Sequence, residues 1–267
     1  MDLLGDPTVA DHPYSLPHLY DVAFSFRDYA RAVDFLLAAA RRASGRDPAS
    51  VVELGCGPGQ YCREFARRGL PAFGVDRAPE MAAYAARLAA GENLPCAILE
   101  ADIRRFTLPH PVDLACCMMA TFHLLLTDDD VAAHLDAVAD NLNPGGIYII
   151  ELSHPRDFLT RQRSTRNLWT VDRDGLSVTV DWGSDAVTDP LSEITTGTVS
   201  YAVSGPSGAA RHESREQWRE ISAGLIRALI RLSGRFAIVA WYGDLDTGVP
   251  FDAGDRAWRM ILVLRLC

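Results

Sequence analysis

The chain has 267 residues, 48% of them hydrophobic and 23% charged, which is enough to bury the core of one α/β domain with an elaboration or a small cap. Its net charge of −9 and the lack of any run of more than two basic residues exclude the basic face that binders of nucleic acid or anionic membranes need. Every basic residue is arginine, so no lysine can act as a Schiff base or general base.

The cysteines do not have the spacing of a disulfide framework or a zinc site. None of the six forms a Cys-x-x-Cys pair, so we expect thiols in a cytosolic core and no metal. The first residues lack a positive region followed by an apolar stretch, and no segment approaches membrane-spanning length. The sequence therefore predicts a soluble cytoplasmic protein.

The first part of the chain alternates between strand and helix patterns. Apolar spacing predicts a helix over residues 25–44, which Gly45 ends. Strands are then predicted at 50–54, 72–75, 96–100, 112–117 and 147–152, with helices at 58–68, 79–91 and 128–142 between them. The strands lack strict polar alternation, which indicates a parallel sheet covered by helices on both faces.

The pattern changes after the fifth strand. Residues 166–221 contain alternating stretches at 176–182, 194–203 and 211–221, separated by turn sequences, and predict an antiparallel insertion of three or four strands. Ser222 then caps an amphipathic helix that ends at Gly234. Two final strands are predicted at 236–242 and 258–266.

A glycine-rich turn, Gly55-Cys56-Gly57-Pro58-Gly59, joins the first strand to the next helix. Glycines at this place allow a sharp turn and let a ligand touch the backbone. Sites for nicotinamide cofactors share this feature, so the glycines alone do not identify the ligand.

Three carboxylates follow successive strands of the predicted sheet. Glu53 ends the first strand, where it can meet a ligand ammonium; Asp76 ends the second, where it can accept ribose hydroxyls; and Asp102 follows the third. Acidic groups oppose the pyrophosphate of a dinucleotide and favour a cationic cofactor. Helix capping would explain one such acid, but less readily three at successive strand ends.

Together with 111–115 and 142–146, these motifs resemble in order and spacing the class I S-adenosylmethionine-dependent methyltransferases, over about residues 18–154. The resemblance implies a doubly wound α/β fold, with a seven-stranded, mostly parallel, Rossmann-like sheet closed by an antiparallel hairpin. We expect helices of an N-terminal lid at 1–45, the cofactor-binding core at 46–155, an insertion capping the substrate cleft at 156–221, and the last helix and hairpin at 222–267.

The resemblance also implies roles for individual residues. S-Adenosylmethionine would lie across the carboxyl ends of strands one to four, and Tyr20 in the lid would close over it or reach the substrate; a packing role for Tyr20 stays open. The remaining implied contacts are Glu53, Gly55, Gly57 and Gly59 to the methionine part, Asp76 to the ribose, Arg77, Met81, Asp102 and Ile103 to the adenine, and Met118 and Met119 near the sulfonium.

The segment Met118–His123 lacks the Asn/Asp-Pro-Pro-Tyr sequence found in relatives that methylate nucleic acids or protein glutamine. The lid and the β-rich insertion are similar to those of sugar N-methyltransferases and glycine methyltransferases. We therefore expect methyl transfer to an O, N or C atom of a small, biosynthetic molecule. Two alternatives stay open: a protein that binds the cofactor without methylating, and a nicotinamide-dependent oxidoreductase. A homodimer also stays open.

Two histidines are candidates for removing a proton from the acceptor, because histidine titrates near neutral pH. His123 follows the fourth strand and is our first candidate; His154 follows the fifth. The alternatives are that His123 caps a loop and that His154 shapes a turn. For Trp169 and Trp182 we favour sheet packing over a substrate pocket. Four arginines follow the fifth strand, at positions 156, 161, 163 and 166. They indicate either a solvated loop or a site that binds an anionic group of the acceptor.

Overall fold

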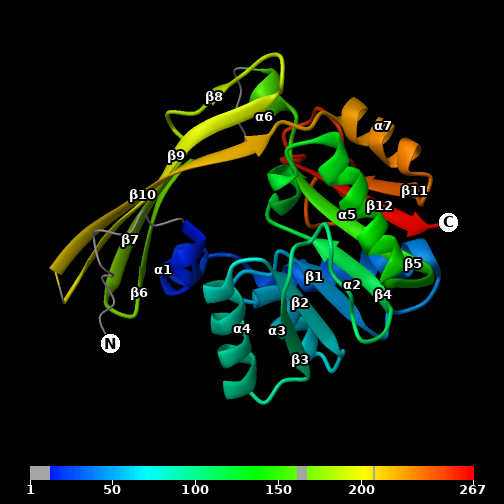
Figure 1. The fold of residues 1–267 in the computed structure, drawn as a ribbon, viewed down its shortest axis with the longest axis horizontal. Helices are drawn as coiled ribbons and strands as arrows, with labels where there is room; N and C mark the ends of the chain where they lie inside the picture. The colour runs from blue at the N-terminus through cyan, green and yellow to red at the C-terminus, as the bar shows by residue number, and fades with distance from the viewer. Residues whose placement is uncertain (1–12, 161–166, 207) are drawn as a thin grey trace.

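The computed structural model describes residues 13–160, 167–206 and 208–267. Figure 1 shows a large sheet with helices on both of its faces and a second sheet that stands beside it. The large sheet has seven strands in the order β11-β12-β5-β4-β1-β2-β3. In the described ranges, no helix has the length and apolar character needed to cross a membrane.

Five strands of the large sheet run parallel, and the last two close it as an antiparallel hairpin beside β5. This confirms the doubly wound, mostly parallel fold. The strand order reverses at β1, which lies between β2 and β4, and such a reversal opens a crevice at the carboxyl ends of the strands. The strands are β1 (Val51–Leu54), β2 (Ala72–Asp76), β3 (Cys96–Glu100), β4 (Val112–Cys117), β5 (Leu142–Ser153), β11 (Phe236–Tyr242) and β12 (Arg259–Leu266).

Helices cover both faces of this sheet, and each face has its own cluster of buried side chains. One cluster joins the sheet to α2 (Tyr29–Ser44) and α3 (Gln60–Arg67), and the other joins it to α5 (Asp128–Asp140) and α7 (Ala223–Ser233). A further helix, α4 (Pro79–Gly91), packs on β2 and β3. Strand β12 alternates between the clusters, with Leu262 in one and Ile261 in the other, as the two-residue period of a strand requires.

The helix predicted over 25–44 is present as α2, which begins four residues later than predicted and ends at Gly45, and a shorter helix precedes it. After a short 3₁₀ turn, η1 (Pro13–Ser15), α1 (Pro17–Ala23) ends before the connection at 24–28. Asp28 then accepts the backbone N–H of Arg31 at 2.9 Å. This is an N-cap bond, so α2 begins anew at Tyr29.

The second sheet has five strands, one or two more than predicted, because 168–173 and 187–188 also pair. All its pairings are antiparallel. The sheet packs on α1 through a third apolar cluster that includes Leu19, Val22 and Val178, and Trp169 Nε1 donates to the Ala23 carbonyl at 2.9 Å. Figure 1 shows α1 between this sheet and the rest of the molecule. The strands are β6 (Leu168–Arg173), β7 (Leu176–Trp182), β8 (Val187–Thr188), β9 (Ile194–Gly205) and β10 (Gly208–Arg219).

Candidate functional site

A cavity of about 1210 Å³ lies at the carboxyl ends of the parallel strands. Its walls come from four parts of the chain: the loops that follow β1 to β5, the N-terminal segment 14–32, the second sheet, and the segment 244–259 that joins β11 to β12. Pockets for a single small molecule usually measure roughly 300–1,000 Å³. The cavity therefore has room for a cofactor together with a second ligand.

The glycine-rich turn forms one end of the cavity. Gly55 and Gly57 line it, with φ of +68° and +50°, a conformation that favours glycine. A Cβ atom on Gly55 would also collide with the side chain of Thr121. The turn therefore leaves its backbone open to a ligand, as the expected cofactor requires.

Asp76 holds this turn in shape. Its Oδ2 accepts the N–H of Gly57 at 2.7 Å and its Oδ1 accepts the N–H of Ala78 at 2.9 Å. Burial raises the pKa of the Asp76 carboxyl, and the backbone hydrogen bonds oppose that shift. Because each carboxylate oxygen can accept more than one hydrogen bond, Asp76 can still receive ribose hydroxyls.

At the far side of the turn, Asp102 and Ile103 line the cavity together with Arg77. Arg104 donates to the Asp102 carboxylate, with Nη2 at 2.7 Å, and holds its pKa below the usual range. The carboxylate expected to bind the adenine is thus shared with an arginine that the sequence did not single out.

Four of the predicted contact residues lie behind the cavity wall: Glu53, Gly59, Met81 and Met118. Glu53 is 4% exposed, and its Oε2 accepts the backbone N–H of Cys62 in α3 at 2.8 Å. Burial raises the pKa of Glu53 to about 8, so its carboxyl is mostly protonated at neutral pH. The direct contact predicted between Glu53 and an ammonium group does not match this geometry.

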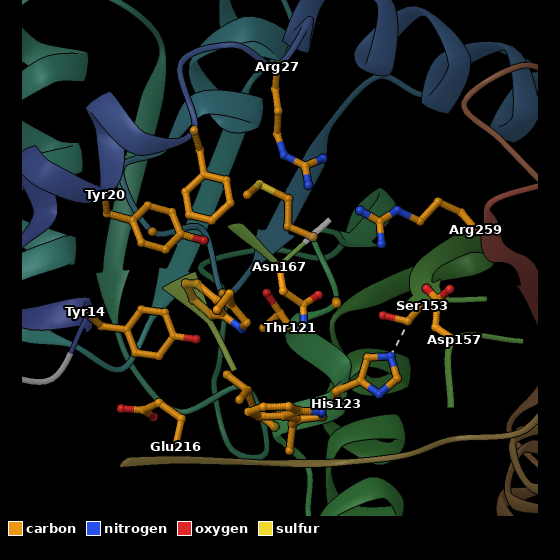
Figure 2. Close-up of a pocket in the computed structure, with 18 of the residues that line it drawn as sticks. Tyr14, Tyr20, Arg27, Thr121, His123, Ser153, Asp157, Asn167, Glu216 and Arg259 are labelled. Atoms are coloured by element: carbon orange, nitrogen blue, oxygen red, sulfur yellow. Dashed lines mark hydrogen bonds between the residues drawn. The ribbon is translucent and has the colours of Figure 1, made fainter. Parts of the chain in front are cut away.

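Tyr20 lines the cavity, as the resemblance implied. Its ring lies 4.5 Å from that of Phe24 and 6.0 Å from that of Tyr14, measured between centroids. Figure 2 shows the hydroxyl groups of Tyr14 and Tyr20 pointing into the cavity from the same side. The lid therefore contributes an aromatic wall with two polar tips.

His123 also lines the cavity, but both of its ring nitrogens are engaged. Nδ1 lies 2.6 Å from the carbonyl oxygen of Arg219, and Nε2 accepts the N–H of Ser153 at 3.1 Å (Figure 2). Burial lowers the pKa of His123 to about 4. A ring that uses its only lone pair in this way cannot take a proton from the acceptor, so the geometry argues against the general-base role.

His154 lies outside the cavity lining. Its Nε2 is 3.0 Å from the Asp252 carbonyl oxygen, and its Nδ1 accepts the backbone N–H of Arg156 at 3.1 Å. These bonds match the turn-shaping alternative and not the catalytic one. Arg156 in turn donates to the carbonyls of Gly254 and Ala257 at 2.7 and 2.8 Å, while 161, 163 and 166 lie outside the described residues.

Beyond the glycine turn, the cavity is lined by residues considered in the sequence analysis and by others that were not predicted. Met119, which was expected near the sulfonium, lines the cavity with φ of +55°, and its N–H donates to Glu151 Oε2 at 2.8 Å. Trp169 and Trp182 both line the cavity and pack on Phe24. The packing role and the pocket-lining role considered for these residues are therefore compatible. The unpredicted lining residues include Tyr14, Arg27, Thr121, Asp157, Glu216, Glu220 and Arg259. Within the described ranges, no group of three or more potential metal ligands occurs.

Residues 51–146 match the family model described as a methyltransferase domain. An N,N-dimethyltransferase of dTDP-3-amino-3,6-dideoxy-α-D-glucopyranose from Streptomyces fradiae is 27% identical over 208 residues, covering 76% of this chain and 77% of the relative. The chain is a class I S-adenosylmethionine-dependent methyltransferase. The alternative of a nicotinamide-dependent oxidoreductase is therefore wrong.

Other relatives of this methyltransferase differ in substrate. A trans-aconitate 2-methyltransferase from Streptomyces avermitilis is 41% identical, but only over 110 residues, which cover 38% of each chain. In fold, the enzyme is similar to an S-adenosylmethionine-dependent methyltransferase from Clostridium acetobutylicum, with a TM-score of 0.76 and 17% identity over 93% of this chain and 96% of that one. It is also similar to an amino pentose methyltransferase from Micromonospora echinaspora, with a TM-score of 0.70 and 18% identity over 98% and 100% of the two chains.

Proposed function

We propose that this methyltransferase methylates an amine nitrogen of a small, polar acceptor such as an amino sugar. The observation that carries the proposal is the engagement of both nitrogens of His123, which leaves this cavity histidine unable to act as a base. The relative from Streptomyces fradiae, which covers most of the chain, dimethylates an amino group on a nucleotide sugar and supports the same choice.

The chemistry of an amine fits a cavity without an available histidine base. S-Adenosylmethionine supplies a methyl group that is already activated for displacement. A neutral amine attacks with its own lone pair after losing its proton to solvent, whereas a hydroxyl group needs a base during the reaction. For the amine, correct placement in the cavity can supply most of the rate increase, since proximity and orientation are worth up to about 7–11 kcal/mol.

The cofactor is assigned to the end of the cavity over β1 to β3. In this proposal the backbone of Gly55 and Gly57 receives the methionine part, and the carboxylate of Asp76 receives the ribose. The other proposed cofactor contacts are Tyr20, Arg77, Asp102, Ile103 and Met119, all of which line the cavity.

The acceptor is assigned to the remaining space, between His123 and the second sheet. Three carboxylates border it: Asp157 after β5, Glu216 on β10 and Glu220 after it. Their negative charge attracts a cationic amine and raises its concentration in the cavity. The second sheet is, on this proposal, the domain that caps the substrate cleft.

The experiment compares two sugars that differ in one heavy atom, nitrogen or oxygen, and adds an unrelated carboxylate acceptor. Purified enzyme with S-adenosylmethionine is offered thymidine-diphosphate sugars that carry either an amino or a hydroxyl group at carbon 3, and trans-aconitate, with products detected by mass spectrometry. We expect a mass gain of one or two methyl groups on the amino sugar alone. Transfer to the hydroxyl sugar would refute the amine proposal. Binding of the cofactor with no transfer to any acceptor would support the non-methylating alternative.

Two further properties are proposed on more general grounds. The six cysteines are all unpaired, as in proteins of reducing compartments, so we propose a cytoplasmic location. A homodimer remains a proposal that sedimentation of the purified enzyme would test.

A further inference from the structure

Two arginines that no motif singled out meet at one wall of the cavity. Arg27 lies in the connection between α1 and α2, and Arg259 begins β12. Figure 2 shows their guanidinium groups reaching toward the same part of the cavity from two sides. Both residues line the cavity, although they lie near opposite ends of the sequence.

Neither guanidinium group donates a hydrogen bond to a described residue, and the Nε atoms of both are buried. The Arg259 side chain is 6% exposed and forms a buried ion pair with Glu151, Nε to Oε1 3.0 Å, but this contact lacks hydrogen-bond geometry and involves one of the three guanidinium nitrogens. Burying a guanidinium without hydrogen bonds costs several kcal/mol. Such a group in a cavity wall indicates that a ligand completes its bonding.

Aromatic rings fix the orientation of both groups. The guanidinium carbon of Arg259 lies 4.3 Å from the Trp258 ring centroid, and that of Arg27 lies 5.8 Å from Phe24 and 5.9 Å from Phe26. A guanidinium group that contacts a ring through its face keeps its N–H edge free. This edge matches the two oxygens of a carboxylate or phosphate.

Two carboxylates support the charge of the arginines: Asp157, which lines the cavity, and Glu151, which is buried behind its wall. Glu151 raises the pKa of Arg27, and Glu151 and Asp157 oppose the effect of burial on the pKa of Arg259. Glu151 is already committed, because its Oε2 accepts the N–H of Met119 at 2.8 Å. Asp157 has partners of its own. The ion pair of Arg259 with Glu151 balances charge, but neither carboxylate accepts a hydrogen bond from either guanidinium group within the described residues.

The position of Arg259 separates it from the cofactor end of the cavity. Arg259 is on β12, three strands from β1 in the order β12-β5-β4-β1. With neighbouring strands about 4.8 Å apart, this places Arg259 roughly 14 Å across the sheet from the glycine turn. Met119, after β4, lies between them.

We propose that Arg27 and Arg259 bind an anionic group of the methyl acceptor, either a carboxylate or a phosphate. The inference rests on the proposed function, since it needs an acceptor in this part of the cavity. It restricts the acceptor class to molecules that carry an anion a short distance from the nucleophile. Amines that carry no carboxylate or phosphate would then be poor substrates.

The experiment measures binding of two anions to the enzyme saturated with S-adenosylhomocysteine, by calorimetry. Thymidine diphosphate serves as the phosphate probe, trans-aconitate as the carboxylate probe, and thymidine as the neutral control. We expect at least one anion to bind, and Arg27→Gln and Arg259→Gln each to weaken that binding about 10-fold or more. The anion that binds shows whether the subsite takes a phosphate or a carboxylate. No binding of either anion to the native enzyme, or equal binding to the variants, would overturn the proposal.

Two controls separate this result from misfolding and from a cofactor role. Arg259→Lys keeps a positive charge beside Glu151 but loses the two-pronged edge, so it should fold and still weaken anion binding. The affinity for S-adenosylhomocysteine should stay within about twofold in all three variants. If it falls 10-fold together with anion binding, the arginines hold the carboxylate of the cofactor and the proposal is wrong.

Methyl transfer distinguishes the two proposals. Equal kcat/KM for amines with and without an anionic group, together with the same kcat/KM values in Arg27→Gln, would leave the proposed function intact and refute the anion subsite. Binding of an anion that depends on both arginines, without methylation of any amine, would refute the proposed function and support the subsite.

Discussion

The substitution His123→Ala separates a catalytic from a structural role for this cavity residue. The ring is 4% exposed and bridges two distant segments, through the carbonyl of Arg219 and the N–H of Ser153. Removing the ring takes a partner from the buried carbonyl of Arg219 and from the partly buried N–H of Ser153, each costing about 1–3 kcal/mol unless water replaces the bond. We expect the free energy of unfolding to fall by about 3 kcal/mol. For a chain of this size that lowers Tm by roughly 6–12 °C.

Turnover should respond differently from stability. Because the lone pair of His123 already accepts the N–H of Ser153, kcat per folded enzyme should change by no more than about threefold. The assay is methyl transfer at saturating cofactor, well below the Tm of the variant, with the folded fraction taken from circular dichroism. A loss of kcat of about 100-fold with Tm lowered by less than 2 °C would refute this reasoning and restore the general base.

Acid should reduce the difference in stability between the two proteins. The pKa of His123 is about 4 when folded, below the 6.5 expected when unfolded. Above pH 6.5 the histidine is neutral in both states and contributes no pH dependence. Between pH 6.5 and 4 the unfolded chain binds a proton that the folded chain does not, so the native protein loses about 1.4 kcal/mol per pH unit through this group. The variant lacks that loss, and thermal melts at pH 7.5 and 5 would show its deficit shrinking; a constant deficit would contradict the pKa.

Three further substitutions test the cofactor end. Glu53→Gln replaces a carboxyl that is mostly protonated at neutral pH, since its pKa is about 8. The free energy of unfolding should therefore change by less than about 1 kcal/mol, and the affinity for S-adenosylhomocysteine by less than threefold. An affinity weakened more than 10-fold would show that a carboxylate contacts the ligand. Asp76→Ala should weaken binding of S-adenosylhomocysteine in calorimetry by about 10- to 100-fold, because it removes the acceptor of ribose hydroxyls and loosens Gly57; unchanged affinity would end the ribose assignment. Gly55→Ala should abolish measurable binding, because φ is +68° and the new methyl group meets Thr121; Thr121→Ala should restore only part of it, and full retention in Gly55→Ala would contradict the geometry.

The strand predictions were accurate where an apolar run was bounded on both sides. β3 (Cys96–Glu100) and β4 (Val112–Cys117) have the predicted bounds. β5 begins at Leu142, five residues before the predicted start at Ile147, because Leu142 pairs with Val112 although Asn143-Pro144-Gly145-Gly146 has the composition of a turn. Local composition cannot show that a neighbouring strand is there to pair with such a segment.

The position of Glu53 could have been predicted more accurately from the alternation of its strand. Val52 and Leu54 belong to one buried cluster, and Val51 belongs to the other. Alternation places Glu53 on the same face as Val51, under α3, so it bonds Cys62 and does not reach the cavity.

The rest of the site depends on contacts between distant segments. Gly55 and Asp76 were found because each follows a strand directly, and the fold brings such positions to one edge. Arg27 and Arg259 meet only after the lid and the last strand have packed, and no spacing in the sequence relates them. The same holds for His123, whose lone pair is taken by Ser153 from another strand.

The separation of the three apolar clusters has a consequence for how this enzyme can diverge. Among the residues that the structure describes, the two clusters that hold the large sheet contain no buried residue from β6 to β10, whereas the third joins those strands to α1. A substitution in the second sheet can therefore reshape one end of the cavity while the packing under the glycine turn stays the same. Lineages of such enzymes can therefore vary β6 to β10 and keep the packing beneath the glycine turn. Grafting α1 together with 168–219 is the corresponding route for engineering, with Tyr20 on α1 retained as a proposed cofactor contact.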